Sequence, residues 1–248
     1  MPLPSAAEIE EASLRSWPAL DTAVDGRWVM GASGGYTRRA NSVQSLDAAD
    51  DGDAAARLER AVRWYRDRRL PPFFRVTPLT GPGILAEIEH WAAEGHSKVL
   101  ALDLGPLSFS VDENVALVPP TSSGWLKEQQ KLKGLDDDTL ARLRRIVERI
   151  TVPARGLTIY VGHGEPAASA VMMVANGILY TGNVVTAPGH RRQGLARRLL
   201  ETGMHWARKA GARRAAINVE ADNAPAIALY QGLGYVPHYE YHYRSPGK

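Results

Sequence analysis

The chain contains no cysteine, which excludes disulfides, thiol catalysis and zinc sites built on thiolates. It has no apolar run near the roughly 20 residues needed to cross a bilayer, and its N-terminus lacks the basic-then-apolar pattern of a signal peptide. The histidines show no metal-ligand spacing, so no metal is expected. These absences predict a cytoplasmic protein with no membrane partner.

The chain also has little excess charge, +3 over 248 residues, which does not favour a nucleic-acid-binding protein. The distribution is uneven. Eight of the 30 Lys and Arg residues lie within 190–214, where an even spread would place about three. Glu201 is the only acidic residue in that segment. Such a local cationic surface indicates an anionic partner, either a phosphate-bearing small molecule or a nucleic acid.

The spacing of apolar residues predicts alternating helices and strands in both halves of the chain. A Gly34-Gly35 turn is expected inside a hairpin over 26–46, and Asn176-Gly177 is a second turn signal. The segment 118–124 is the best linker candidate. The predicted helices are 5–17, 54–69, 83–95, 123–133, 138–150, 194–210 and 224–232, and the predicted strands are 73–79, 98–105, 156–164, 167–177, 178–187, 215–220 and 235–244.

The most informative stretch is TAPGHRRQGLARRLL, residues 186–200, where a predicted strand ends and a predicted helix begins. The first turn of a helix presents free N–H groups and the positive end of the helix dipole, a site suited to anions. Gly194 has no side chain, so backbone can approach a phosphate closely. We therefore interpret the stretch as a pyrophosphate cradle. The alternative is a turn into a basic, solvent-facing helix.

The cradle is neither a Walker loop, which needs Gly-Lys-Ser/Thr, nor a three-glycine dinucleotide fingerprint. Its pattern Arg191-x-x-Gly194-x-Ala196 resembles the acyl-CoA signature of the GNAT N-acetyltransferase family. Downstream, NAPAIALYQGLGY (223–235) resembles the family's Asn-x-x-Ala-x-x-Leu-Tyr-x-x-x-Gly-Phe/Tyr block. The resemblance covers roughly 120–248. The first half is similar, more weakly, to the leading region of two-lobed bacterial GNAT proteins whose first lobe has lost its cofactor site.

This resemblance implies an α/β (α+β) fold of the GNAT acyl-CoA N-acyltransferase type, a central mixed, mostly antiparallel sheet flanked by helices. A smaller GNAT-like α/β lobe lacking a cofactor motif would occupy 1–118, and the catalytic domain 119–248. The implied reaction moves an acetyl group from acetyl-CoA to an amine on a small molecule or a protein. No nucleic-acid partner is expected, and the oligomeric state stays open. A non-enzymatic acyl-CoA sensor and a nucleic-acid binder are the alternatives.

The resemblance also carries roles to individual residues. The family holds the pyrophosphate with backbone N–H groups of the signature loop and pairs the preceding, splayed strand with the pantetheine arm. Tyr230 matches the family's usual acid for the departing thiolate. Asn223 is expected to cap its helix, with a cofactor contact left open. The implied cofactor-binding residues are Val184, Val185, Thr186, Arg191, Arg192, Gln193, Gly194, Leu195, Ala196, Arg197, Asn223 and Tyr230.

The base and the acceptor site are less defined. Tyr180 stands where some protein-acetylating members carry a glutamate, and a tyrosine is a poor base unless its pKa is lowered. Other candidates near predicted strand ends are Glu220, His163 and Glu165. Candidates for lining the acceptor site are Trp125 and the last strand with Tyr239, Tyr241 and Tyr243.

Overall fold

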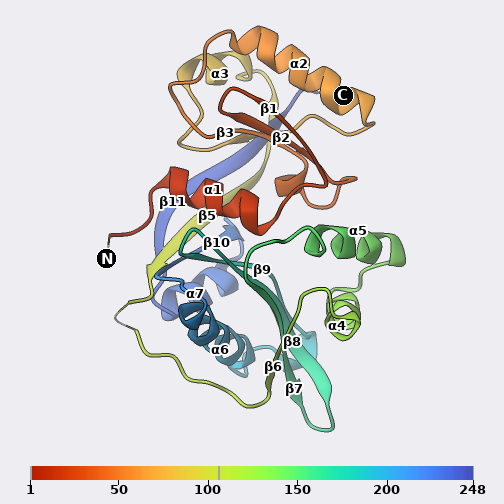
Figure 1. The fold of residues 1–248 in the computed structure, drawn as a ribbon, viewed down its shortest axis with the longest axis vertical. Coiled ribbons are helices and arrows are strands. Elements are labelled where there is room, and N and C mark those ends of the chain that lie inside the picture. The colour runs from red at the N-terminus through yellow and green to blue at the C-terminus, as the bar shows by residue number, and fades with distance from the viewer. Residues whose placement is uncertain (1, 106, 248) are drawn as a thin grey trace.

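The computed structural model describes residues 2–105 and 107–247. Its helices and strands are interspersed along the chain, and Figure 1 shows their arrangement. The helices are α1 (Ala6–Ser16), α2 (Ala54–Asp67), α3 (Pro82–Glu87), α4 (Ser123–Lys133), α5 (Asp137–Val147), α6 (Leu195–Lys209) and α7 (Ala224–Gly232), with short 3-10 turns η1 (Arg38–Ala40) and η2 (Pro188–His190). The strands are β1 (Asp21–Asp25), β2 (Trp28–Ala32), β3 (Val43–Ser45), β4 (Phe74–Val76), β5 (Ala92–Asp103), β6 (Val115–Val118), β7 (Ala154–Val161), β8 (Glu165–Ala175), β9 (Ile178–Thr186), β10 (Arg214–Glu220) and β11 (Val236–Ser245).

All eleven strands in the described residues join one sheet in the order β1-β2-β3-β4-β11-β5-β10-β9-β8-β7-β6. Only the β3–β4 and β9–β10 pairings are parallel. The expectation of a mixed, mostly antiparallel sheet flanked by helices is confirmed. No helix within 2–105 and 107–247 combines the length and apolar character needed to cross a bilayer.

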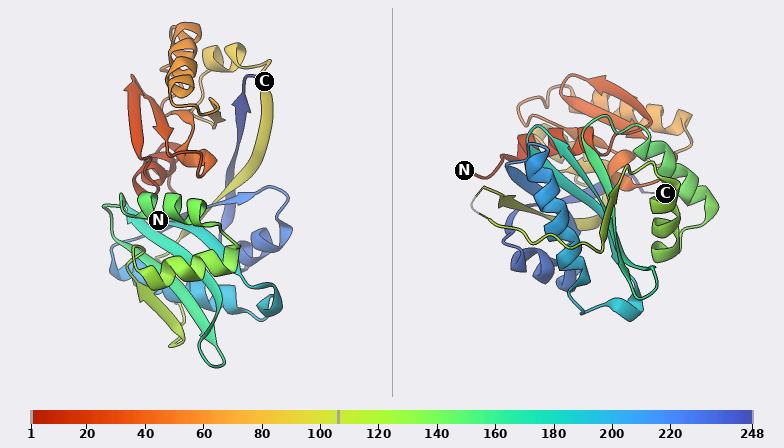
Figure 2. Two further views of the ribbon diagram at one scale, coloured as in Figure 1. Left: turned by 90° about the vertical axis from the view of Figure 1, so that its right-hand side faces the viewer. Right: turned by 60° about the horizontal axis from the view of Figure 1, so that its bottom comes forward.

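The two halves of the chain exchange strands. β5, from the first half, lies between β10 and β11 of the second, pairing from Ser97 to Asp103 with β10 and from Ala92 to Ala101 with β11. The far end of β11 then pairs with β4 of the first half. Figure 2 shows β5 and β11 running side by side from one lobe into the other. The domain boundary at 118/119 stays a prediction. Because strands of the two halves are interleaved, neither half of the chain forms a separate sheet.

Three apolar clusters hold the helices on the sheet. One lies beneath α6 and α7, and includes Leu199 and Met204. A second, on the opposite face, packs α1, α4 and α5 against β8 and β9, and includes Trp125 and Tyr180. The third joins α2 and α3 to β2, β3 and β4. The sheet of the second half is therefore covered on both faces, and α1 from the N-terminus belongs to one cover.

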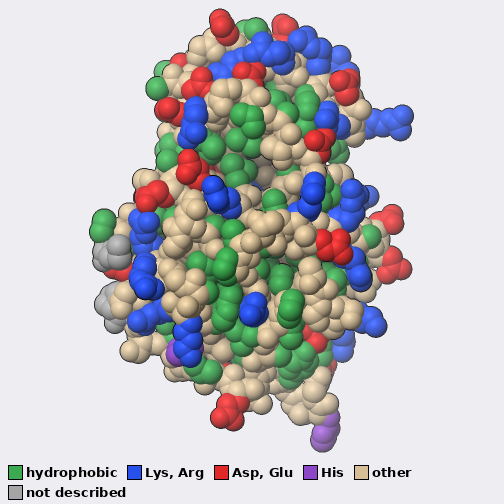
Figure 3. Space-filling model, viewed as in Figure 1, with side chains coloured by type: hydrophobic (Ala, Val, Ile, Leu, Met, Phe, Trp, Pro, Cys, Tyr) green, Lys and Arg blue, Asp and Glu red, His purple; other side chains and the backbone are tan. Residues whose placement is uncertain are grey.

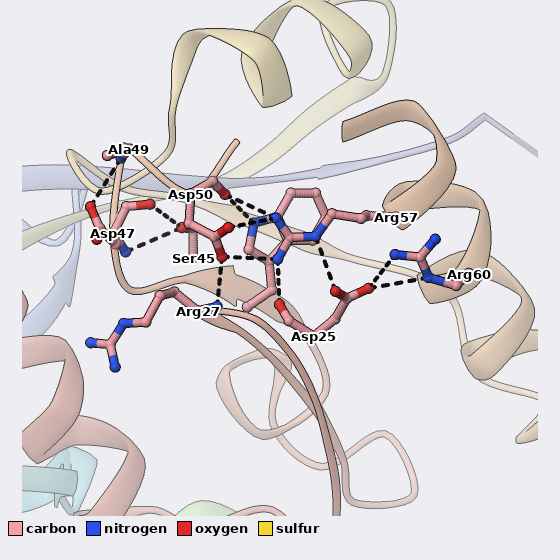
Figure 4. Close-up of polar contacts among 9 residues, drawn as sticks. Asp25, Arg27, Ser45, Asp47, Ala49, Asp50, Arg57 and Arg60 are labelled. Atoms are coloured by element: carbon pink, nitrogen blue, oxygen red, sulfur yellow. Dashed lines mark hydrogen bonds and ion pairs between the residues drawn. The ribbon is translucent and has the colours of Figure 1, made fainter. Parts of the chain in front are cut away.

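An arginine fastens the first lobe. The Arg57 side chain is 6% exposed and pairs with Asp50 (Nη2–Oδ2, 2.9 Å) and Asp25 (Nε–Oδ1, 3.2 Å). Its guanidinium also lies 4.2 Å from the centre of the Trp28 ring. Figure 4 shows Arg57 between the two carboxylates, with Arg60 on the far side of Asp25. The two carboxylate partners offset the cost of burying this cation, which explains why an arginine can lie among the apolar residues of this lobe.

Two local predictions for the first half are wrong. The helix expected over 83–95 ends at Glu87, and 92–95 already belong to β5. The pairing of β5 with β11 overrides the helix-favouring alanine and glutamate residues of this segment. The tight hairpin joins β1 to β2 through Gly26 (φ 58°), while Gly34-Gly35 lie in the longer loop before β3.

The second half follows the sequence pattern closely. The Asn176-Gly177 turn is confirmed between β8 and β9, with φ of 52° and 73°, as a tight hairpin turn requires. The helices α4 to α7 and the strands β7 to β11 all lie where the pattern places them, with ends shifted by a few residues.

Candidate functional site

The site begins at a bulge in β9. Val171 of β8 pairs with Gly182 and Ser169 pairs with Val185, so Asn183 and Val184 together oppose the single residue Ala170. Asn183 has φ 53°, in the left-handed region. A bulge leaves part of the ladder unpaired and turns the strand, which frees backbone N–H groups at this point for another partner.

One face of α4 fixes this bulge. Trp125 Nε1 donates to Ala170 O (3.1 Å), and Gln129 Nε2 donates to Asn183 O (3.2 Å) and to Ser169 Oγ (2.8 Å). One turn further along, Lys133 Nζ donates to Asn183 Oδ1 (3.2 Å). The three side chains are four residues apart and therefore share one helix face. They donate hydrogen bonds to oxygen atoms of both strands at the bulge.

Trp125 does not contact the cleft, so its suggested role in binding substrate is wrong. The side chain is 1% exposed and packs on β7 at Gly156, where an added Cβ would lie 2.6 Å from the indole. Trp125 instead packs beneath the sheet and supports β8 opposite the bulge through its hydrogen bond to Ala170. The tyrosines of β11 are likewise directed to the junction of the lobes, where Tyr239 Oη donates to Glu10 (2.6 Å) and Tyr241 lies under Arg75.

Beyond the bulge, β9 and β10 separate. Their parallel pairing extends from Ile178↔Arg214 to Thr181↔Ile217 and then stops, although both strands continue. A cleft of about 1340 Å³ opens at this gap and extends to the start of α6 and to α7. The splayed strand predicted before the signature loop is therefore present, and its backbone faces an open groove.

The signature loop forms the wall at one end of the cleft. After η2 the chain reaches Gly194 (φ 75°, ψ 0°), and α6 begins at Leu195. A Cβ added at Gly194 would meet no atom within 4 Å, so this position faces open space. Arg192 also has a positive φ of 59°. Successive left-handed and helical residues turn N–H groups toward one point, the geometry of an anion-binding nest.

The cations of 190–214 do not form one continuous surface. Arg198 pairs with Asp112 (2.5 Å) and Arg214 with Glu8 (2.9 Å). Arg191, Arg192 and Arg197 line the cleft. Figure 3 shows basic and acidic side chains interspersed over the face that it displays. Arg197 is also paired with Glu201 (2.9 Å), so Arg191 and Arg192 are the cleft arginines without a carboxylate partner among the described residues, which favours a compact anion over a long polyanion.

Eleven of the twelve predicted cofactor-binding residues line this cleft. Gln193 is the exception: its amide donates to Gly189 O (3.2 Å), and it borders a second, smaller cavity at the β7–β8 turn. Asn223 caps α7, as expected, by accepting from Ala226 N (3.2 Å). The residues brought together are Val184, Val185, Thr186, Arg191, Arg192, Gly194, Leu195, Ala196, Arg197, Asn223 and Tyr230.

Tyr230 lies on α7 where this helix borders the cleft. It is 5% exposed, and burial raises its pKa to about 12. Its ring packs edge-on against Tyr235, with centroids 6.1 Å apart. The Tyr230 ring therefore belongs to the core beneath α6 and α7, and the residue also lines the cleft.

The residues considered as the general base lie in three different places. Glu220 lines the cleft, whereas His163 and Glu165 border the second cavity. Tyr180 is fully buried, and its hydroxyl accepts from Arg39 Nη1 (2.9 Å). Burial raises the pKa of Tyr180 and the Arg39 charge opposes that rise, so the phenol stays neutral inside the core and cannot take a proton from a substrate in the cleft.

The sequence analysis did not predict the residues that shape the end of the cleft opposite Gly194. Lys133, Asn183 and Asn218 line it, and Gln129 supports it from below. The spacing of Trp125, Gln129 and Lys133 along one helix face was a usable signal. The contributions of Asn183 and Asn218 depend on the bulge and on the separation of the strands, which the sequence pattern does not reveal.

Comparison with known proteins agrees with this geometry. The family described as "Probable histone acetyltransferase Rv0428c C-terminal" matches residues 6–244. An uncharacterized N-acetyltransferase of Bacillus subtilis, YobR, is 27% identical over 243 residues, covering 96% of this chain and 97% of that protein.

Two solved structures share the fold. A GCN5-related N-acetyltransferase from Kribbella flavida superposes with a TM-score of 0.73 at 21% identity, covering 98% of this chain and 96% of its own. A tandem GNAT protein from the clavulanic acid biosynthesis pathway gives 0.66 at 16% identity, with 99% and 90% covered. Since the family match spans both lobes and the signature loop, this chain belongs to the Rv0428c C-terminal acetyltransferase family and is an acyltransferase of the GNAT N-acetyltransferase type.

Proposed function

We propose that the protein transfers an acetyl group from acetyl-CoA to a primary amine by direct attack of the amine on the thioester. The observation that carries this proposal is the continuous cleft that joins the nest at Gly194, the bulge at Asn183 and Tyr230. The residues present fit coenzyme A: a nest with open space above Gly194 and three lining arginines suit a pyrophosphate.

Each part of the cleft has a separate task. Backbone N–H groups of 192–196 and the side chains of Arg191, Arg192 and Arg197 would hold the pyrophosphate. The backbone of Val184, Val185 and Thr186 would pair with the pantetheine arm, which carries the activated acetyl group. A free N–H at the bulge would stabilise negative charge on the thioester oxygen, an effect worth roughly 3 kcal/mol per donor in other acyl-transfer sites.

Tyr230 would donate its hydroxyl proton toward the departing sulfur. Because burial keeps this phenol protonated up to a pH of about 12, the donor is available throughout the physiological range. Glu220 is the only carboxylate among the described residues that line the cleft, so we assign it the proton lost by the attacking amine, directly or through water.

The test is thiol release from acetyl-CoA in the presence of a panel of primary amines, with the product identified by mass. Transfer to at least one amine supports the proposal. Tight binding of acetyl-CoA with no transfer to any amine would instead support the alternative, a non-enzymatic acyl-CoA sensor.

A further inference from the structure

The end of the cleft opposite Gly194 is lined by Lys133, Thr181, Gly182 and Asn183. Tyr180 and Ala216 face α1, α4 and α5, so strand alternation places Gly182, Asn218 and Glu220 on the same side of the sheet. The bulge turns Asn183 to that side as well, where it meets Lys133. From this side of the sheet, a second substrate can reach the bulge without passing the signature loop.

The first lobe adjoins this end of the cleft through the turn at Tyr36–Arg39. The Arg39 guanidinium lies 5.0 Å from the Tyr180 ring centre and 5.6 Å from that of Trp17. A Cβ added at Gly182 would lie 3.8 Å from Arg39 Nη2, so the guanidinium approaches β9 directly beside the bulge. The N-terminal lobe, which carries no cofactor motif, thereby gains a role next to the acceptor.

This wall is rich in donors and positive charge but has no anion of its own. Within the described residues, no carboxylate lies within 4 Å of the cationic groups of Lys133 or Arg39. Arg39 Nε is buried and has no hydrogen-bond partner among the described residues, whereas the Tyr36 hydroxyl lies against the Asn183 side chain. The nearby Glu10 is already paired with Arg75 (2.6 Å) and with Tyr239.

Positive charge without a carboxylate partner is costly to keep near the protein interior, and an anion at this end of the cleft would offset it. Across the gap, Asn218 has both amide atoms unpartnered and Glu220 is negative, which suits an amine.

We propose, on the basis of the acetyl-transfer function above, that the acceptor carries a carboxylate close to its amine. The carboxylate binds beside Lys133 of α4, at the end of the cleft that adjoins the Arg39 charge of the first lobe, and the amine points toward Asn218 and Glu220. The acceptor class is therefore an amino acid or a similar amino-carboxylate.

The test compares acceptors with the same side chain, with and without the carboxylate: free L-amino acids and their carboxamides, assayed by thiol release from acetyl-CoA, with kcat/KM expressed per unprotonated amine. We expect the free acids to have a kcat/KM at least ten times that of the amides. Lys133→Met should reduce this ratio several-fold, while Lys127→Met, an exposed lysine on the same helix outside the cleft, should leave it unchanged. Lys133 is itself solvent-accessible, so its replacement should not prevent folding.

Equal rates with acids and amides would overturn this inference and leave acetyl transfer intact. A preference for acids that persists in Lys133→Met would also overturn it. Binding of acetyl-CoA without transfer to any member of either series would overturn the proposed function as well.

Discussion

The hydroxyl of Tyr230 provides the sharpest test of the proposed chemistry. Tyr230→Phe removes one oxygen and keeps the ring in its packing against Tyr235. An ordinary thiol has a pKa of about 8.5, so full proton transfer from a phenol of pKa about 12 is uphill by roughly 5 kcal/mol, unless burial also raises the thiol pKa. We therefore expect the hydroxyl to act mainly as a hydrogen-bond donor to the leaving sulfur.

A hydrogen bond to a charged group contributes about 1.5–3 kcal/mol, which corresponds to a fall in kcat of about 10- to 150-fold. The Kd for acetyl-CoA, measured by calorimetry, should change little, because the interaction forms only as the sulfur gains charge. Since the neutral phenol is lost only as the pH rises through about 12, the wild-type kcat should show no decline from Tyr230 between about pH 6 and 10.

Tyr235→Phe is the matched control. Tyr235 is 2% exposed, packs against Tyr230 and does not line the cleft. Its replacement should leave kcat within about twofold of the wild type. The reasoning is refuted if Tyr230→Phe keeps its full kcat, or if both variants lose activity equally.

Three further predictions concern the loop, the bulge and the first lobe. Gly194→Ala places a Cβ in the open space of the cradle and should weaken acetyl-CoA binding at least tenfold by calorimetry (about 1.4 kcal/mol). Gly211 is also a left-handed glycine, at the other end of α6, so Gly211→Ala should reduce stability by a similar amount and leave acetyl-CoA binding unchanged. Gln129→Met leaves a buried carbonyl at the bulge without its donor, so we expect a loss of about 1–3 kcal/mol in unfolding free energy and a fall in kcat of tenfold or more with little change in acetyl-CoA affinity; an unchanged kcat would contradict this role. Asp50→Asn should destabilise the protein at pH 7 in urea unfolding, because Arg57 and a backbone N–H lower the pKa of the Asp50 carboxyl. This stabilisation is complete above the ordinary pKa of about 4 and is lost as the pH falls through the lowered pKa. A stability difference between variant and wild type that did not shrink in acid would refute this prediction.

The geometry of the cleft around the signature loop could be predicted because its determinants are contiguous. The residues 184–197 form a strand end, a loop and a helix start, and each part has a local signal: β-favouring valines, a glycine at a left-handed position and an amphipathic helix. The same holds for Asn223, whose capping role follows from its place before α7.

The opposite end of the cleft could not be predicted, because it is assembled from distant segments. Lys133 reaches Asn183 only through the packing of α4 on β9, and Arg39 approaches Gly182 only through the packing of the first lobe. The strand exchange likewise makes local structure depend on residues that are distant in the sequence. The segment 92–95 has the composition of a helix but pairs with β11 near the opposite end of the chain.

The central claim is that the nest at Gly194 and its arginines grip a coenzyme A pyrophosphate. Calorimetric titration of the wild-type protein with acetyl-CoA tests this claim most directly. We expect saturable one-to-one binding that weakens as salt is added, because the grip is largely electrostatic. Absence of any binding heat up to about 1 mM acetyl-CoA would contradict the account.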